Sequence, residues 1–361
     1  MTTRIKHLYV HVPFCRSICF YCDFAHRVYD EKLVSKWLDR LAREIEENCQ
    51  DQYETIYIGG GTPSALKDRE LEKLLQLIGP FSRQVKEYTI EVNPESLDAS
   101  KADLFKKYGI NRISMGVQSS DDQLLKSLNR KHTFADVKDG IAMLREKDFN
   151  NISVDLMYSL PCQDLDSLKK SLDDILQLNV EHISLYSLTI EENTVFGKRG
   201  VKAADDELEA DMYEYIEECL CHNGYEHYEI ANFCKPGKAS RHNLAYWRYE
   251  DFLGVSAGAA GKTGAFRYTN TRDIARYISA DDIRDEKVYL SKDDQRFENI
   301  MMSLRTAEGL DLKQFNERYD CDFVHEYAAV LRDQPSLVIK DDHLICENRE
   351  ILNTILLAFL P

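Results

Sequence analysis

Residues 11–24 read HVPFCRSICFYCDF and bring three cysteines, Cys15, Cys19 and Cys22, into the spacing C-x3-C-x2-C. Three thiolates suit a cubane iron–sulfur cluster in which one iron is left without a protein ligand. On spacing alone a structural zinc ion is the alternative, because His26 follows Cys22 by four residues and could complete a Cys3His site. The other seven cysteines are scattered, and we interpret them as small buried hydrophobic residues or unreactive surface thiols.

The composition of the 361-residue chain is that of a folded, acidic protein, with 43% hydrophobic residues and a formal net charge of −16. Such a charge repels nucleic-acid phosphates, so we expect no nucleic-acid partner. The sequence has no run of 18 apolar residues, so we expect no transmembrane segment. Its first residues resemble neither a secretion signal nor a transit peptide, and we therefore expect a cytoplasmic protein.

Between residues 8 and 188, short β-rich runs alternate with amphipathic helical runs. Apolar residues at helical spacing, such as Val34, Trp37 and Leu41, mark the helices. The predicted strands are 8–12, 55–58, 88–92, 112–117, 152–157 and 182–188. Repeated β-then-α units imply a parallel sheet with right-handed crossovers. Since six units are too few for the usual eightfold barrel, the expected fold is α/β with a partial (β/α)6 barrel.

The pattern changes after residue 188. We expect a charged helix at 205–223, a strand at 225–230 and a glycine- and alanine-rich segment at 252–264. From residue 291 the chain is expected to be helical, with a β hairpin at 336–346 and a last helix from about residue 349. The expected domains are a barrel at 1–200, an extension at 201–290 and a smaller, winged-helix-like α+β domain at 291–361.

The cysteine motif follows the first predicted strand, and Gly59-Gly60-Gly61-Thr62-Pro63 ends the second. Together the two motifs resemble those of the radical S-adenosylmethionine (SAM) enzymes. In that family a [4Fe–4S] cluster binds SAM at its open iron, and an electron from the cluster cleaves SAM to a deoxyadenosyl radical. Because zinc has no redox chemistry, the resemblance favours the cluster over the zinc site.

The sequence also resembles, over nearly its whole length, the oxygen-independent coproporphyrinogen III oxidase group of this family. The segments that carry the likeness are 9–15, 59–64, 91–95, 116–119, 129–130, 155–157 and 304–309. It implies SAM contacts at Tyr9, Tyr21, Gly60, Gly61, Thr62, Glu91, Gln118, Arg130 and Asp155. Glu91 and Asp155 end apolar strands, where a buried charge needs a partner, and this favours a binding role. Gln118 and Arg130 could equally be loop scaffolding.

The group divides into decarboxylating oxidases and a haem-chaperone branch. The oxidases resemble C-x3-C-x2-C-x-C, whereas Phe24 occupies the position of that last cysteine here. Residues 242–247 read HNLAYW and resemble the HNxxYW motif of the haem-chaperone branch. The resemblance implies haem contacts from His242, Tyr246 and Trp247, since histidine can bind haem iron and aromatic rings can pack on a porphyrin. A buried histidine that is hydrogen-bonded within a turn is the alternative.

The resemblance therefore implies a haem chaperone that binds a [4Fe–4S] cluster, SAM and haem and passes haem to membrane haemoproteins such as respiratory cytochromes. It leaves open whether the chain is an enzyme and whether it forms a homodimer. The acidic charge argues against attraction to anionic lipid, so we expect any membrane contact to be peripheral and driven by a partner. A coproporphyrinogen III oxidase and a zinc-stabilised binding protein are the alternatives.

Cys162 departs from the pattern of the group, in which a glycine is usual at this position. If the backbone there has a positive φ, a cysteine is strained. We expect its side chain near the end of the SAM pocket, and we do not count it as a cluster ligand.

Overall fold

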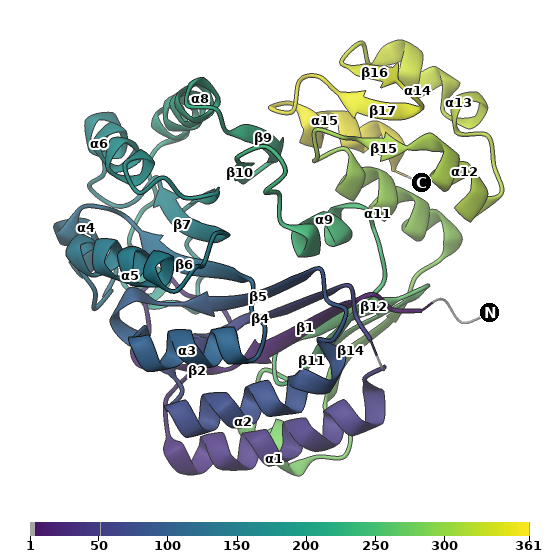
Figure 1. Ribbon diagram of the computed structural model, residues 1–361. Helices are drawn as coiled ribbons and strands as arrows, with labels where there is room; N and C mark the ends of the chain where they lie inside the picture. The colour runs from purple at the N-terminus through teal and green to yellow at the C-terminus, as the bar shows by residue number, and fades with distance from the viewer. Residues whose placement is uncertain (1–3, 51, 361) are drawn as a thin grey trace.

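The computed structural model describes residues 4–50 and 52–360 (Figure 1). Its main sheet has the strand order β14-β13-β12-β11-β1-β4-β5-β6-β7-β8-β10-β9. At its centre lie the parallel strands β1 (His7–Val12), β4 (Thr55–Gly60), β5 (Glu87–Val92), β6 (Arg112–Gln118), β7 (Ile152–Tyr158) and β8 (His182–Ser187). These strands follow one another in chain order, and the sheet ends at β14 and β9 without closing. The α/β partial barrel expected from the sequence is confirmed.

Helices between the strands cover the outer face of the sheet (Figure 1). They are α1 (Glu31–Asn48), α2 (Asp68–Ile78), α3 (Ala99–Lys107), α4 (Asp122–Ser127), α5 (Phe134–Glu146) and α6 (Leu165–Leu176). The carboxylate of Asp30 accepts from the amide of Leu33 and so caps the start of α1, which buries Trp37 and Leu41 as predicted. In the described part of the chain, no helix combines the length and apolarity needed to cross a bilayer.

The two faces of the parallel strands differ in polarity. Alternate residues such as Leu8, Val10 and Ile58 are fully buried in the apolar core that the helices share. The residues between them contact one another across neighbouring strands on the concave side of the sheet, and they are polar: His7, Tyr9, Thr55, Tyr57, Glu91, Ser114 and Asp155. Because strand side chains alternate with a period of two, the same strands build both the core and a polar interior.

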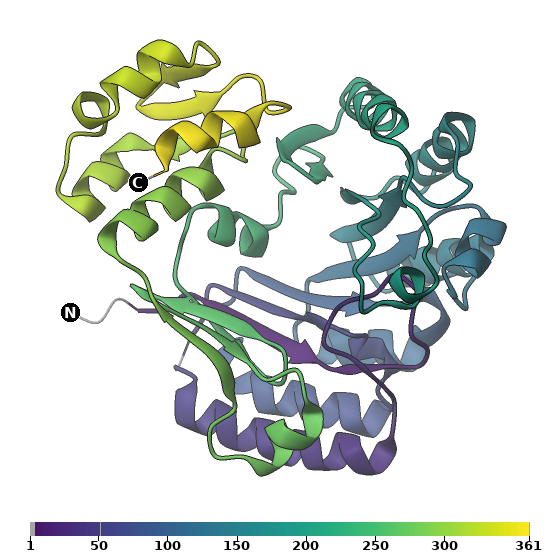
Figure 2. The same ribbon diagram turned by 180° about the vertical axis from the view of Figure 1, so that it is seen from behind.

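Residues 226–289 extend this sheet at both edges. β11 (Phe252–Val255) pairs in parallel with β1, and β12 (Ala260–Thr263), β13 (Phe266–Asn270) and β14 (Arg284–Tyr289) follow in antiparallel order beside it (Figure 2). β10 (Asn232–Cys234) and β9 (Glu226–Glu229) continue beyond β8, after α8 (Asp206–His222). The sequence predicted β9 but took 252–264 only as a segment of small residues. A Cβ at Gly254 would overlap the carbonyl of Ala260, so this hairpin requires its small residues.

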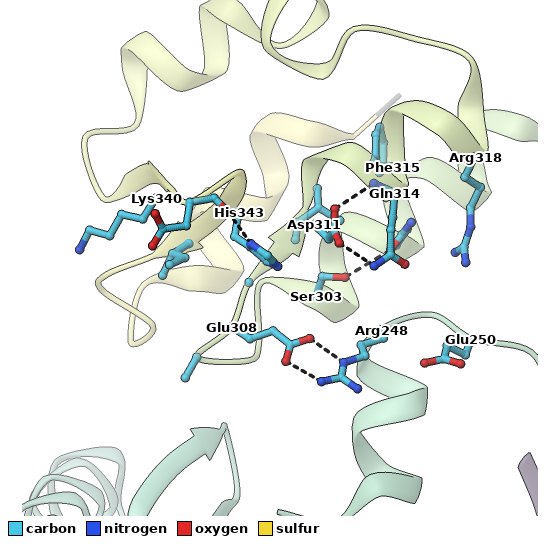
Figure 3. Close-up of a pocket in the computed structure, with 16 residues that line it drawn as sticks. Arg248, Glu250, Ser303, Glu308, Asp311, Gln314, Phe315, Arg318, Lys340 and His343 are labelled. Atoms are coloured by element: carbon cyan, nitrogen blue, oxygen red, sulfur yellow. Dashed lines mark hydrogen bonds and ion pairs between the residues drawn. The ribbon is translucent and has the colours of Figure 1, made fainter. Parts of the chain in front are cut away.

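The C-terminal part folds around a separate apolar core that includes Ile300, Phe315 and Leu344. Its elements are α11 (Lys292–Ser303), β15 (Leu310–Asp311), α12 (Leu312–Tyr319), α13 (Phe323–Glu326), α14 (Ala328–Asp333), β16 (Leu337–Lys340), β17 (His343–Cys346) and α15 (Leu352–Leu356). β16 and β17 form the predicted hairpin. This part contacts α9 (Arg241–Trp247) directly, since the hydroxyl of Ser303 donates to the carbonyl oxygen of Trp247 at 3.3 Å. A cavity of about 630 Å³ lies beside this contact, and there Arg248 donates two hydrogen bonds to Glu308 (Figure 3). The domain limits at 200 and 290 remain predictions from the sequence.

Candidate functional site

A cavity of about 260 Å³ lies where the parallel strands end, beside the loop that carries the cysteine motif. It brings together most of the residues that the sequence analysis singled out for the cluster and for SAM. They are Cys15, Cys19, Tyr21, Cys22, Gly60, Gly61, Thr62, Glu91, Gln118, Arg130 and Asp155. The carboxyl ends of parallel strands are the usual place for ligand sites in α/β folds. Tyr9, His242, Tyr246 and Trp247 do not line this cavity.

The three cysteines are carried by β2 (Phe14–Cys15) and by the loop before β3 (Arg27–Val28). The hydroxyl of Thr62 donates to Sγ of Cys15 at 3.5 Å, and Nη1 of Arg130 donates to Sγ of Cys19 at 3.5 Å. Burial raises the pKa of Cys15 to about 12 and that of Cys22 to about 11, so both are protonated thiols when they bind nothing. A ligand that takes thiolates must therefore displace protons here.

The donor set fits a cluster. Within 4–50 and 52–360, no three His, Cys, Asp or Glu side chains are grouped closely enough to hold a single metal ion. A cubane cluster binds each thiolate to a different iron, so its cysteines stand around the cluster and need no such grouping. Nδ1 of His26 lies 3.6 Å from Sγ of Cys22 and 2.6 Å from the carbonyl oxygen of Phe24, which orients the imidazole beside the cysteine loop.

The triple glycine allows β4 to end in close contact with β1. At Gly60, φ is 108°, and a Cβ there would lie 2.5 Å from the ring of His11. A Cβ at Gly61 would lie 2.8 Å from the carbonyl oxygens of Val12 and Phe14. Glycine is therefore required at both positions, and it leaves bare backbone along the wall of the cavity.

Glu91 and Asp155 enter the cavity from β5 and β7. Glu91 accepts from the hydroxyl of Tyr57 at 2.8 Å and from the amide of Gly60 at 2.9 Å, and Asp155 accepts from the hydroxyl of Ser114 at 3.2 Å. Burial, with the charge of Asp155 added, raises the pKa of Glu91 to about 7, and burial also raises the pKa of Asp155. A ligand that brings hydroxyl or ammonium groups between them would stabilise both ionised carboxylates, and SAM carries both kinds of group.

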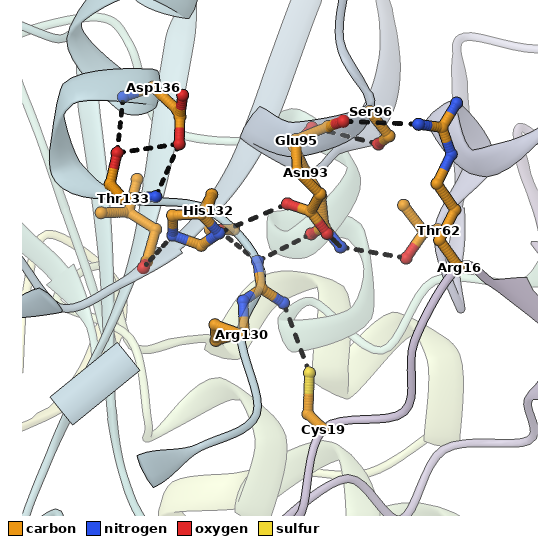
Figure 4. A network of polar contacts seen from close by, with 12 residues as sticks. Arg16, Cys19, Thr62, Asn93, Glu95, Ser96, Arg130, His132, Thr133 and Asp136 are labelled. Atoms are coloured by element: carbon orange, nitrogen blue, oxygen red, sulfur yellow. Dashed lines mark hydrogen bonds and ion pairs between the residues drawn. The ribbon is translucent and has the colours of Figure 1, made fainter. Parts of the chain in front are cut away.

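Arg130 is held in place by several hydrogen bonds (Figure 4). Its Nη2 donates to the carbonyl oxygen of Gly116 at 2.6 Å and to Oδ1 of Asn93 at 2.9 Å. Among the described residues, its buried Nε has no hydrogen-bond partner. The side chain therefore acts as scaffolding, and its positive charge at the cavity wall favours an anionic group such as a ligand carboxylate.

Gln118 ends β6 with a φ of 70°, and its side-chain oxygen accepts from the hydroxyl of Tyr186 at 2.9 Å. Tyr186, Asn93 and Ser184 also line the cavity, and the sequence analysis did not name them. A signal was present, because Ser184 and Tyr186 occupy alternate positions of a predicted strand and Asn93 follows Glu91 by two residues.

Tyr9 and the HNLAYW motif belong to a second group of residues, deeper in the barrel. α9 sits against the amino ends of the strands, where the carboxylate of Glu87 accepts from the amides of Arg241 and His242 at 2.8 and 2.9 Å. His242 is buried, and burial lowers its pKa to about 3, so its imidazole is neutral. Its Nδ1 lies 2.7 Å from Oγ1 of Thr55, and its Nε2 lies 2.7 Å from the hydroxyl of Tyr246.

His242 is therefore buried and hydrogen-bonded, but its partners are Thr55 of β4 and Tyr246 of α9, and not groups within a turn. The ring of Tyr57 connects the two groups of residues, since its centroid lies 5.3 Å from that of His242 while its hydroxyl bonds Glu91. Tyr9 bonds Nδ1 of His11 at 2.9 Å, and the His11 ring packs against Gly60. Through His11, Tyr9 thus supports the glycine-rich wall of the cavity beside the cysteine loop, although it does not line that cavity.

Cys162 has a φ of 67°, so the strain expected for a cysteine at this position is present. Its side chain is exposed and is not part of the cavity wall.

Comparison with known proteins agrees with this geometry. The profile of the Radical SAM superfamily matches residues 9–175, and that of the HemN C-terminal domain matches residues 290–352. A solved structure of coproporphyrinogen III oxidase (HemN) from Escherichia coli superposes with a TM-score of 0.85 at 22% identity, covering 99% of this chain and 90% of that one. That likeness establishes the fold.

Among curated proteins, the heme chaperone HemW of Bacillus subtilis (strain 168) is 37% identical over 347 residues, 91% of either chain. The heme chaperone HemW of Lactococcus lactis subsp. lactis (strain IL1403) is 35% identical over 341 residues, covering 92% of this chain and 90% of its own. The fold and the cysteine cavity thus define a radical SAM protein. Within that superfamily, the chain belongs to the heme chaperone HemW family.

Proposed function

We propose that this chain holds a [4Fe–4S] cluster on Cys15, Cys19 and Cys22 and binds SAM in the adjoining cavity. The cluster would supply one-electron redox chemistry. Glu91 and Asp155 would accept hydrogen bonds from the ligand's hydroxyl and ammonium groups, and the guanidinium of Arg130 would attract its carboxylate. Gly60, Gly61 and Thr62 would contact it along the glycine-rich wall, and Tyr21 and Gln118 complete the cavity.

We further propose that the chain binds haem and delivers it to membrane haemoproteins such as respiratory cytochromes, acting from the cytoplasm with peripheral membrane contact. The observation that carries this proposal is the sequence identity of 35–37% between this chain and two proteins named haem chaperones, over about nine-tenths of each chain. The residues proposed for haem are His242, Tyr246 and Trp247 on α9. Their chemistry fits haem, because an imidazole can bind iron and the rings of Tyr246 and Phe252, 4.5 Å apart, form an apolar surface.

The test is anaerobic reconstitution with iron and sulfide, followed by titration with haem and by incubation with coproporphyrinogen III, SAM and a reductant. The proposal predicts a brown protein that binds haem saturably and forms no protoporphyrinogen. Repeated turnover of coproporphyrinogen III would support the oxidase instead. A colourless protein that contains zinc would support the structural zinc site. Size-exclusion chromatography of the same sample measures whether the chain forms a homodimer.

A further inference from the structure

A second, mostly apolar cavity of about 260 Å³ lies against α9, on the side away from the cysteine loop. It is formed by the end of α9, by β11 to β13 and by α11. Its apolar wall consists of Tyr246, Phe252, Met301 and Met302. Tyr246 is thus shared between this cavity and the hydrogen bond to His242.

A chain of four hydrogen bonds runs from one lining residue of this cavity to another through the interior of the barrel. Glu250, which lines the cavity, has Oε2 3.1 Å from Nε2 of His7. Nδ1 of His7 lies 2.8 Å from Oγ1 of Thr55, which in turn lies 2.7 Å from Nδ1 of His242. The chain ends where Nε2 of His242 meets the hydroxyl of Tyr246 at 2.7 Å.

The direction of these bonds follows from the hydroxyl of Tyr246. Among the described residues, this hydroxyl has no hydrogen-bond partner other than Nε2 of His242, so it donates its proton there. Because the imidazole of His242 is neutral, Nε2 then carries a lone pair, and Nδ1–H donates to the oxygen of Thr55. The hydroxyl of Thr55 can in turn donate to Nδ1 of His7. Histidines that bind metals usually have this arrangement, with one nitrogen donating to a fixed acceptor and the other free for the metal.

We propose, building on the haem-binding function above, that this cavity receives one edge of the porphyrin and that Tyr246 is a gate over the iron-binding nitrogen of His242. In the haem-free protein the Tyr246 hydroxyl is hydrogen-bonded to Nε2 of His242. When haem enters, this hydrogen bond breaks, the tyrosine side chain moves away, and Nε2 binds the iron. Thr55, His7 and Glu250 are positioning residues that keep the lone pair of His242 on the side of the gate.

The size and lining of the cavity agree with this ligand. Whole drug-sized ligands occupy about 300–1,000 Å³, so a cavity of 260 Å³ takes part of a porphyrin while the rest lies outside it. Thioether and aromatic side chains suit the flat apolar ring. Arg267 lies at the rim with 44% of its side chain exposed, and although it pairs with Glu298 at 2.5 Å, its remaining N–H groups can bond a propionate.

The test compares Tyr246→Phe with Tyr225→Phe in the reconstituted, full-length protein. Tyr225 is a matched control, because its buried hydroxyl also makes a hydrogen bond, to the carbonyl oxygen of Val180 at 2.7 Å, and it lines neither of the two cavities. Haem affinity and the Soret band are measured by titration with hemin, and cluster content is measured as a check on folding. Tyr246→Phe removes a bond that haem must break, so its affinity should rise by up to about tenfold, which corresponds to about 1.4 kcal/mol.

The Soret band of Tyr246→Phe should match the wild type, and Tyr225→Phe should bind haem like the wild type. His242→Gln should shift the band and weaken binding. If Tyr246→Phe loses the wild-type band, the tyrosine is itself the ligand and the gate is wrong. If Tyr246→Phe binds haem no more tightly than the wild type, or if His242→Gln keeps the wild-type band, the cavity is not the haem site although the protein binds haem. If the wild type binds no haem, the proposed function fails together with this inference.

Discussion

The substitution Glu91→Gln tests the electrostatics of the SAM cavity most sharply, because burial raises the pKa of Glu91 from 4.5 to about 7. The folded protein then keeps the proton up to about pH 7, whereas the unfolded chain releases it near pH 4.5. Stability therefore falls as the pH rises through this window and levels off above it. The rise in pKa corresponds to about 3 kcal/mol, and glutamine removes this loss. Its oxygen can accept from the amide of Gly60, and its NH2 group can donate to the hydroxyl of Tyr57.

The assay is urea unfolding of the cluster-free protein between pH 5 and pH 8. The free energy of unfolding of Glu91→Gln relative to the wild type should increase across this range by about 2–3 kcal/mol. Glu54→Gln is the control. Hydrogen bonds from Lys86 and Lys6 lower the pKa of Glu54, and neither lysine titrates in this range. The difference between this variant and the wild type should therefore stay nearly constant with pH.

In the reconstituted protein, Glu91→Gln should weaken SAM binding by about tenfold or more, since hydrogen bonds to charged groups contribute about 1.5–3 kcal/mol. Equal pH dependence of the unfolding free energies of Glu91→Gln and the wild type would refute the reasoning, because Glu91 would then titrate as an ordinary exposed carboxyl group.

Three further predictions concern the same cavity. Each of Cys15→Ser, Cys19→Ser and Cys22→Ser should lose the brown absorbance and the EPR signal of the reduced cluster, and full iron content in the triple variant would contradict the ligand assignment. Gly60→Ala should abolish SAM binding and lower the free energy of unfolding in urea by several kcal/mol, because φ at Gly60 is 108° and the new Cβ would lie 2.5 Å from the His11 ring. Wild-type binding and stability would show that the glycine-rich wall of the cavity is not tightly packed. Phe24 lines the cavity with 68% of its surface exposed and stands at the position of the further cysteine in the pattern that the oxidases resemble. The protein should therefore decarboxylate no coproporphyrinogen III under anaerobic turnover conditions, and sustained product formation would contradict this prediction.

The sequence predicted the barrel well because its signals are local. The apolar stripe of α1 and the alternation in β1 report which face each element buries, and the βα repeat then determines a parallel order. The strands β11 to β14 were missed because they are short and because the only one that joins them to the parallel strands, β11, pairs with β1, more than 200 residues away in the sequence. Small residues there indicate close packing but not a strand.

The cysteine cavity was predictable because the ends of consecutive parallel strands meet at one edge. Motifs on β4, β5, β6 and β7 therefore had to converge on the cysteine loop. The surroundings of His242 were not predictable from its motif. They depend on Thr55, His7 and Glu250, which the fold brings together from three distant segments, and the sequence carries no local signal for such a group.

The central claim, that the protein delivers haem, is tested most directly by a transfer measurement. The reconstituted protein is loaded with hemin, mixed with membranes that contain a haem-free cytochrome, and separated from them by centrifugation. The account predicts that the Soret absorbance leaves the soluble fraction and that the cytochrome gains its haem spectrum, faster than from free hemin at the same concentration. Haem that stays with the protein, or a transfer no faster than from free hemin, would contradict it.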